Sequence, residues 1–281
     1  MSSIRNKYFE LKKINNKYIN ENAIKQILMS VNNIDTDFSL LTRFDEEYIN
    51  EELIDKYVEE LKNGKPLQYI LNKAYFLNEE FYVNSNVLIP RNETEELTKL
   101  TINKIKEIYN RQNVQIFDVC CGSGCIGISL KKAFLDSNVY LSDISPLALE
   151  VATKNKDKLN VDVTLLEGDM LSPFVAKDLK ADVIVCNPPY IPSVDTVEES
   201  TLKHEPHLAL FASPSTYFYE QLFKDAPKVL NKLGLICLEI GEDMEESLTL
   251  LVNKYFSKAV YNFYKDMYDK TRFLIIIRDE R

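Results

Sequence analysis

The sequence lacks an apolar run long enough to cross a membrane, so a protein anchored by spanning helices is excluded. Its first residues, "MSSIRNKYFELKK", show neither the apolar core nor the cleavage site of a secretory signal. Five cysteines without a secretory context favour reduced thiols over a disulfide framework. These absences predict a cytoplasmic protein with no membrane partner.

An excess of basic charge is also missing. The chain has 34 Lys and Arg residues against 43 Asp and Glu, a net charge of -9, which weighs against a broad phosphate-binding surface. We therefore expect no direct nucleic-acid substrate, and we expect a monomer. With 281 residues and 45 % hydrophobic content, the chain can bury a sizeable core divided over two domains.

The chain changes character near residue 75. Helical spacing up to about residue 63, closed by Gly64 where a C-terminal cap belongs, predicts a small helical domain over 1–74. Residues 75–93 have strand-like composition around a polar turn, which predicts a hairpin linker.

Residues 94–281 alternate short apolar runs with amphipathic helical segments. This pattern predicts an α/β fold, a mainly parallel sheet with helices on both faces. The expected parallel strands are 114–119, 138–142, 162–166, 182–186 and 235–240. The runs "KAVYNFY" and "RFLIIIR", with no full helix between them, predict an antiparallel pair that closes the sheet.

Glycine is scarce, yet three of the seven glycines, Gly122, Gly124 and Gly127, fall within six residues after the first strand. Glycine at a strand-to-helix turn lets a ligand approach main-chain N–H groups at the helix start, although ordinary tight turns also collect glycine. A dinucleotide loop is disfavoured, because the frame Cys120–Cys125 lacks the first and last glycine.

An acidic residue at the strand end followed by alternate glycines is instead associated with S-adenosylmethionine. The segment that begins at Asp118 fits this pattern with one substitution. The predicted cofactor-binding residues here are Asp118, Cys120, Cys121, Gly122, Ser123 and Gly124.

Two more carboxylates follow the next two strands. Asp143 can accept hydrogen bonds from both hydroxyls of a ribose, although it also precedes Ser145-Pro146, a plain helix entry. Asp169 could receive the adenine amine, with Met170 against the ring. Three such signals after three successive strands strengthen the prediction of S-adenosylmethionine as cofactor.

The fourth strand ends in Asn187-Pro188-Pro189-Tyr190, beside the expected cofactor cleft. Each proline restricts its own φ and the residue before it, so the loop is stiff. An ordinary proline-rich turn is the alternative interpretation.

This loop suggests methyl transfer to a conjugated nitrogen. If the side-chain oxygen of Asn187 and the carbonyl of Pro188 accept both hydrogens of an amide or amino group, its lone pair can turn toward the methyl. Tyr190 can stack on the planar group. Positioning alone supplies about 7 to 11 kcal/mol in favourable cases, and the two acceptors reject a carboxylate.

With these residues in place, the sequence resembles the protein-(glutamine-N5) methyltransferases of class-one peptide chain release factors over nearly its whole length. The tetrapeptide is shared with methylases of adenine and guanine, whereas "LIPRNETE" and "EPHLAL" are typical of the glutamine-modifying branch. The other matching motifs are "GKPLQYI", "LEIG" and "KDMYDKTRFLII".

The resemblance implies a Rossmann-like methyltransferase core with a helical domain and hairpin that grip the release factor. It places cofactor contacts at the loop Cys120–Gly124, Asp143, Met170 and Asn187. It places the glutamine of a Gly-Gly-Gln tripeptide against Asn187, Pro188, Pro189 and Tyr190.

Three positions depart from the family pattern. Cys120 and Asp269 stand where glycine is usual, and Cys120 could crowd the methionine part of the cofactor. Asn92 replaces a common proline after Arg91, which could loosen the helix start.

Other function classes remain open at this point. A methylase of adenine-N6 or guanine-N2 in DNA or RNA would need a basic cleft rim or a nucleic-acid recognition domain. A non-catalytic binding module is disfavoured because the reacting groups are present. Metal binding by His204 and His207 is not expected, since no third ligand is evident and Pro206 lies between them.

Overall fold

The computed structural model describes residues 3–109 and 113–281, and the chain divides into two compact units. The first extends to Lys73 and includes the distant segment Glu199–His204, which the expected domain boundaries did not anticipate. The second comprises Ala74–Glu198 and Glu205–Arg281.

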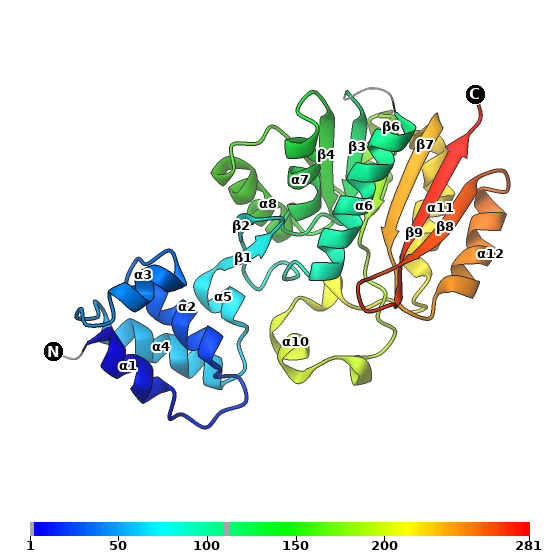
Figure 1. Ribbon diagram of the computed structural model, residues 1–281. Helices are drawn as coiled ribbons and strands as arrows, with labels where there is room; N and C mark the ends of the chain where they lie inside the picture. Colours follow the sequence, from blue (N-terminus) through cyan, green and yellow to red (C-terminus); the bar gives the residue numbers. More distant parts are fainter. Residues whose placement is uncertain (1–2, 110–112) are drawn as a thin grey trace. The chain divides into compact units, whose positions relative to one another are not determined.

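The first unit is helical (Figure 1). Its helices are α1 (Ile4–Leu11), α2 (Glu21–Val31), α3 (Asp37–Thr42), α4 (Glu51–Lys62), α5 (Leu67–Leu71) and α10 (Glu199–His204). Side chains of Ser3, Asn20, Thr36 and Asn50 each accept a backbone N–H at the start of α1 to α4, the usual role of these residue types. Gly64 follows α4 with a φ of 82°, as expected for a residue that ends a helix.

A hairpin begins where the division between the units falls. Strands β1 (Lys73–Phe76) and β2 (Glu79–Tyr82) pair through a two-residue turn. Both turn residues, Leu77 and Asn78, have positive φ, as a type I′ turn requires. Asn155 of the second unit receives the Tyr82 N–H at 2.6 Å and donates to the Tyr82 carbonyl at 2.9 Å, which fixes the hairpin end.

The second unit is built on a seven-stranded sheet of order β5-β4-β3-β6-β7-β9-β8. Its parallel strands are β3 (Gln115–Val119), β4 (Asn138–Asp143), β5 (Thr164–Glu167), β6 (Ala181–Cys186) and β7 (Leu230–Glu239). Strands β8 (Val260–Lys265) and β9 (Thr271–Asp279) are antiparallel to each other, and β9 also pairs with β7. The predicted parallel sheet with an antiparallel closure is confirmed, although β7 begins five residues before the expected 235.

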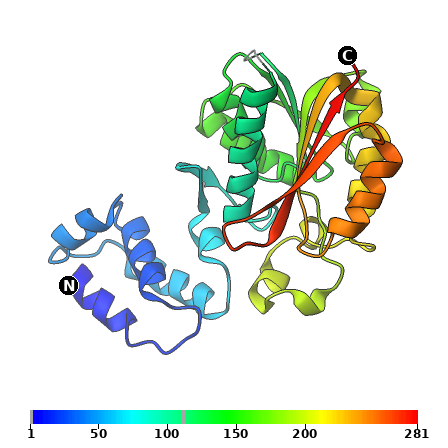
Figure 2. The ribbon, with the colours of Figure 1, turned by 45° about the vertical axis from the view of Figure 1, so that its right-hand side comes forward.

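Helices cover both faces of this sheet (Figures 1 and 2). One face packs against α6 (Asn92–Ile108), α7 (Cys125–Ala133) and α8 (Pro146–Lys158), and the other against α9 (Ser172–Ala176), α11 (Tyr217–Val229) and α12 (Glu245–Tyr255). Every residue of β6 is buried, with Val183 and Val185 in one core and Ile184 and Cys186 in the other. A nearly continuous apolar strand, with Asp182 as its one charged residue, is typical of a central parallel strand between two layers of helices.

The strand order reverses beside β3. The chain runs outward from β3 to β4 and β5, then returns to place β6 on the opposite side of β3. Val119 and Cys186, the last residues of β3 and β6, are register partners. The loops that start at Cys120 and Asn187 therefore leave the sheet side by side, at the position where α/β sheets bind ligands.

Within residues 3–109 and 113–281, no helix is both long and apolar enough to span a bilayer. The same residues contain no cluster of three or more His, Cys, Asp or Glu side chains suited to a metal ion. All five cysteines are free.

Candidate active site

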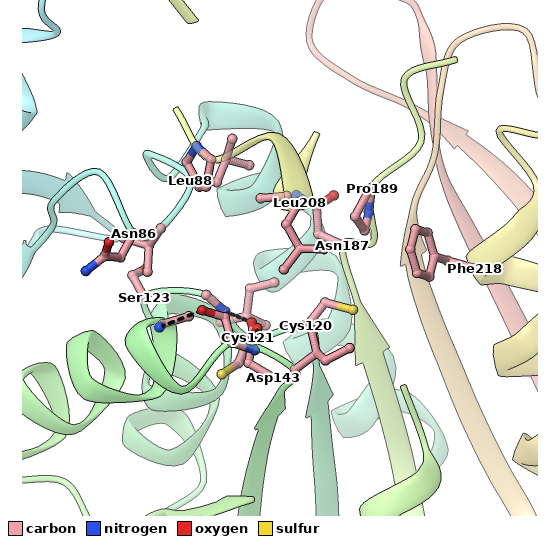
Figure 3. A pocket seen from close by; sticks show the side chains of 18 of the residues that line it. Asn86, Leu88, Cys120, Cys121, Ser123, Asp143, Asn187, Pro189, Leu208 and Phe218 are labelled. Carbon is pink, nitrogen blue, oxygen red and sulfur yellow. Dashed lines mark hydrogen bonds between the residues drawn. The ribbon is translucent and has the colours of Figure 1, made fainter. Parts of the chain in front are cut away.

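A cavity of about 340 Å³ opens at the carboxyl ends of β3, β4 and β6, within the range of roughly 300 to 1,000 Å³ usual for small-molecule sites. Figure 3 shows Asn86 and Leu88 on one side of it and Pro189 and Phe218 on the other, with Cys120 and Asn187 between. The predicted site residues that line the cavity are Cys120, Cys121, Gly122, Ser123, Asp143, Asp169, Met170, Asn187 and Pro189. The predicted residues Asp118, Gly124, Pro188 and Tyr190 lie outside this lining.

The glycine-rich loop is a turn in left-handed backbone. Cys120, Gly122 and Gly124 have φ values of 59°, 53° and 78°. The loop is held by bonds from the Cys121 N–H to the Ser142 carbonyl at 2.9 Å and from the Gly124 N–H to the Cys121 carbonyl at 2.8 Å. A side chain at Gly122 would meet nothing within 4 Å, so the cavity lies open against this backbone.

Gly127 has a different reason to be glycine. It is in α7 with ordinary helical φ, but an added Cβ would lie 2.7 Å from Leu141 Cδ1 and 2.9 Å from Asp118 Oδ2. The glycine therefore lets the helix approach β4 and lets its N–H reach Asp118 at 2.7 Å.

Asp118, which we expected to contact the cofactor, does not line the cavity. Its side chain is fully buried behind the loop, and Oδ2 accepts the Gly127 N–H. Among the residues described, none donates a hydrogen bond to Oδ1. Burial raises the pKa of this carboxyl to about 8, opposed by the Gly127 bond. Burial therefore favours the protonated form of Asp118, which braces the start of α7 from beneath.

Asp143 lies inside the cavity lining. Its Oδ2 accepts the Gly122 N–H and its Oδ1 accepts the Ser145 N–H, both at 2.9 Å (Figure 3). Burial raises the pKa of this carboxyl, while the backbone bonds oppose the shift. Each carboxylate oxygen has two acceptor sites, so each retains capacity toward the cavity. Ser145 also caps α8, because its hydroxyl accepts the Ala148 N–H at 3.2 Å. The interpretation of this segment as a helix entry is therefore correct.

The segment after β5 forms another border. Asp169 is exposed at the cavity edge, whereas Met170 is buried and has a φ of 46°. The Met170 sulfur lies 3.6 Å from the Cys120 sulfur, so these side chains meet beneath the cavity. A polar rim beside an apolar, polarizable floor suits a heteroaromatic ring with an exocyclic amine.

Asn187 is half-buried, and its orientation is defined. Its Nδ2 donates to Thr94 Oγ1 at 3.2 Å, and no described residue donates to its Oδ1. Tyr190, four residues into the same loop, donates its hydroxyl to Glu239 at 3.4 Å. The site thus offers an uncommitted amide oxygen at the cavity wall.

A second loop of the lining is fastened by Glu205, which is 5 % exposed. Its carboxylate accepts the Ile89 N–H at 3.1 Å and pairs with the Arg91 guanidinium. This contact joins the "LIPR" and "EPHLAL" motifs, which are far apart in sequence. It holds Leu88 and Pro90 at the cavity wall.

Sequence reasoning missed four supporting residues. Asn155, fully buried, donates to the Ser123 carbonyl at 2.9 Å and so ties the glycine-rich loop to the hairpin. Thr94, Glu205 and Glu239 lie within the motifs "LIPRNETE", "EPHLAL" and "LEIG", so their place in these motifs was the available signal, and their burial is visible only in the structure.

The sequence is similar to those of known methyltransferases. A family described as "Methyltransferase small domain" matches residues 85–204. A release factor glutamine methyltransferase of Mycoplasma mycoides is 37 % identical over 276 residues, covering 95 % of this chain and 96 % of that protein. Another, of Leptospira interrogans, is 41 % identical over 231 residues, covering 80 % and 78 %.

Solved structures share the fold of the second unit. A 16S rRNA methyltransferase from T. thermophilus, in complex with AdoMet and guanosine, superposes with a TM-score of 0.53 at 15 % identity. The match covers 74 % of this chain and 50 % of that one.

We predict that Cys120→Gly is more stable than Cys120→Ala. A left-handed residue with a Cβ costs roughly 1 to 2 kcal/mol, and the greater freedom of unfolded glycine offsets about 0.4 to 1 kcal/mol of this. The free energy of unfolding, measured in urea, should therefore be about 0.5 to 1 kcal/mol higher for Cys120→Gly than for Cys120→Ala. Cys121, whose φ is not positive, is the matched position, where alanine should be the more stable. The same order at both positions would refute the backbone argument.

Asp118→Asn should change how stability depends on pH. The folded state keeps the Asp118 proton up to a pKa of about 8, whereas the unfolded chain releases it near 3.8, so this group makes stability fall as pH rises between these values. In Asp118→Asn the free energy of unfolding should lack this decrease, which amounts to about 1.4 kcal/mol per pH unit. Urea unfolding of both proteins from pH 5 to 8.5 tests this, and parallel profiles would contradict it.

Proposed function

The chain belongs to the release factor glutamine methyltransferases, and on this premise we propose that it methylates the glutamine side-chain amide in the Gly-Gly-Gln motif of class-one peptide chain release factors. One observation carries the proposal. The uncommitted amide oxygen of Asn187 stands at the wall of a cavity that also contains the glycine-rich loop and Asp143.

The proposed methyl donor is S-adenosylmethionine, which supplies an electrophilic methyl group on a sulfonium sulfur. The residues present fit it. Asp143 keeps two acceptor oxygens for a vicinal diol, and the open backbone at Gly122 leaves room against main-chain N–H groups. We assign its binding to the loop Cys120–Ser123, Asp143 and Asp169–Met170, with the T. thermophilus relative as a structural parallel.

The chain contributes positioning at the target nitrogen. We assign Asn187 Oδ1 and the Pro188 carbonyl as acceptors for the two hydrogens of the substrate carboxamide. Holding both hydrogens draws the nitrogen out of conjugation and directs its lone pair. No strong base is required, because the amide proton becomes acidic only as the nitrogen gains its new substituent. Well-oriented groups of this kind lower a barrier by about 7 to 11 kcal/mol.

The same pair of acceptors gives selectivity for glutamine. A glutamate side chain brings no hydrogens at neutral pH and would leave both oxygens unpaired beside its own negative charge. Unpaired buried acceptors cost about 1 to 3 kcal/mol each. Discrimination by a missing hydrogen-bonding group is therefore strong.

Pro189 borders the cavity and is assigned to substrate contact. Tyr190, predicted to stack on the planar amide, lies outside the lining, and its bond to Glu239 supports a role in holding the loop. Recognition of the release factor by the helical unit, the monomeric state and the cytoplasmic location stay predictions.

The alternative, methylation of adenine-N6 or guanine-N2 in nucleic acid, is not favoured. The relatives that match most of this chain are named for release factors. A net charge of -9 also opposes a polyanionic substrate.

Methyl transfer from labelled S-adenosylmethionine tests the proposal. We expect label on a class-one release factor, none on its Gly-Gly-Ala or Gly-Gly-Glu variant, and none on DNA or RNA. Label that persists on the Gly-Gly-Ala variant, or on nucleic acid alone, would refute the assignment. Peptide mass spectrometry should place the added methyl on the glutamine.

Asn187→Ala should lower kcat about 10²- to 10³-fold, the usual effect of removing one positioned hydrogen-bonding group in a reaction centre. Cofactor affinity, measured by calorimetry, should change far less, because Asp143 and the glycine-rich loop are intact. Asn187→Asp is the companion variant, since its charge attracts the amide hydrogens but alters the bond to Thr94. Unchanged turnover in Asn187→Ala would exclude the assigned role.

A further inference from the structure

A buried carboxylate lies behind the Asn187 loop, outside the cavity lining. Glu239, the last residue of β7, is 3 % exposed. Its Oε2 accepts the Thr94 hydroxyl at 2.7 Å and its Oε1 accepts the Tyr190 hydroxyl at 3.4 Å. Thr94 in turn receives Asn187 Nδ2. Glu239 is therefore bonded directly to one end of the Asn187–Tyr190 loop and, through Thr94, to the other.

While Glu239 is ionised, the chemistry of these groups determines the direction of the bonds that link it to Asn187. An ionised carboxylate can only accept, so the Thr94 hydroxyl must use its single hydrogen on Glu239. Its oxygen is then only an acceptor toward Asn187. The Asn187 side chain must present its NH₂ group to Thr94, which leaves its carbonyl oxygen for the cavity. The orientation follows from hydrogen-bonding capacity and not from atom labels alone.

We propose that Glu239 and Thr94 are positioning residues that set the Asn187 amide with its oxygen toward the substrate. This inference rests on the proposed function, in which that oxygen accepts an amide hydrogen. A hydroxyl released from Glu239 could donate to Asn187 Oδ1 instead. The Asn187 amide would then turn over and direct its NH₂ group at the hydrogens of the substrate amide, which is a repulsive arrangement.

The hydrogen bond from the Tyr190 hydroxyl means that Glu239 also holds the far end of the loop. Tyr190 Cδ2 lies near Gly241, where an added Cβ would be 3.4 Å away. Its ring is thus packed while its hydroxyl is tied to Glu239. The prolines restrict the backbone of the loop, and the carboxylate restricts the two polar side chains that flank them.

The ionisation of Glu239 should therefore affect turnover. Burial raises its pKa to about 7, with Arg272 of β9 and the Thr94 bond opposing the shift and Glu93 of α6 adding to it. Tyr219 of α11 donates to the Glu239 backbone carbonyl, and not to the carboxylate. Below this pKa a protonated Glu239 can donate to Thr94, so the fixed direction is lost. Turnover should rise as pH increases through about 7.

Thr94→Val and Thr94→Ser separate the hydroxyl from the volume of the side chain. Thr94→Val should lower kcat about 10- to 100-fold with little change in the KM for cofactor. This is less than the roughly 10²- to 10³-fold loss for a group that touches the reacting atoms, because Thr94 acts through Asn187. Thr94→Ser keeps the hydroxyl and should recover most of the turnover. Thr101→Val is the matched control, because Thr101 is a buried threonine of the same helix whose hydroxyl bonds the Leu97 carbonyl at 2.8 Å and contacts the Cys237 thiol of β7, rather than Asn187 or Glu239.

Glu239→Gln supplies the pH test. The acid limb near pH 7 should flatten, since no group with that pKa remains behind the loop. An acid limb that persists unchanged in Glu239→Gln contradicts the proposal. Equal losses in Thr94→Val and Thr101→Val also overturn it, because they would indicate general damage to α6.

A readout independent of turnover separates this inference from the proposed function. The side-chain NH₂ resonances of Asn187, assigned by their loss in Asn187→Asp, should shift in Thr94→Val and Glu239→Gln but not in Thr101→Val. Unshifted resonances in both variants overturn the positioning role even where the release factor is methylated. Shifted resonances in a protein that methylates no release factor support the positioning role and refute the proposed function.

Discussion

The register of β3 with β6 is the constraint on which the site depends. Because Val119 and Cys186 are partners across the switch point, the glycine-rich loop and the Asn187 loop begin at adjacent positions. Residues nearly seventy apart in sequence are thereby brought to one edge without any flexible element. A shift of one residue would exchange the side chains that β6 contributes to the two cores, and neither core would then be filled by residues of the right size. Burial of that strand on both faces thus fixes the site as well as the core.

Backbone conformation bears on the three positions where the resemblance leads us to expect another residue. Cys120 and Asp269, which stand where glycine is usual, have φ values of 59° and 64°. The left-handed geometry is retained although the residue that favours it is absent. Asp269 is the milder case, because aspartate tolerates this region better than most residues. Asn92 is the first residue of α6, where proline is favoured but not required.

The sequence was sufficient to predict the sheet, its antiparallel closure and the loops that border the cavity, because these depend on local periodicity and on residues next to strand ends. It did not show on which side of the loop Asp118 lies, since a strand-end acid can point into the crevice or beneath the loop, and only the close approach of Gly127 decides between them. Glu199–His204 joined the first unit unexpectedly for a similar reason. Contacts across long sequence separations have no periodic signature.

The residues that sequence reasoning missed share one physical role. Asn155, Glu205 and Glu239 are buried polar side chains, each bonded to segments remote in sequence. Apolar residues of similar volume would fill the same space, and replacing buried polar groups in that way is often neutral for stability. Such apolar residues would not, however, fix the orientation of the groups that they pack against. A hydrogen-bonded network admits few geometries, so it holds a loop in one orientation where apolar packing would allow several.

Direction is what an amide acceptor needs, because a carboxamide and its inverted form have nearly the same shape. Packing cannot distinguish the two ends of Asn187, but a hydroxyl already committed to a carboxylate can. The contact between Thr94 and Glu239 spans 145 residues of sequence and joins α6 to the end of β7. In the proposed site, the buried carboxylate of Glu239 therefore determines, through the Thr94 hydroxyl, which end of the Asn187 amide faces the substrate.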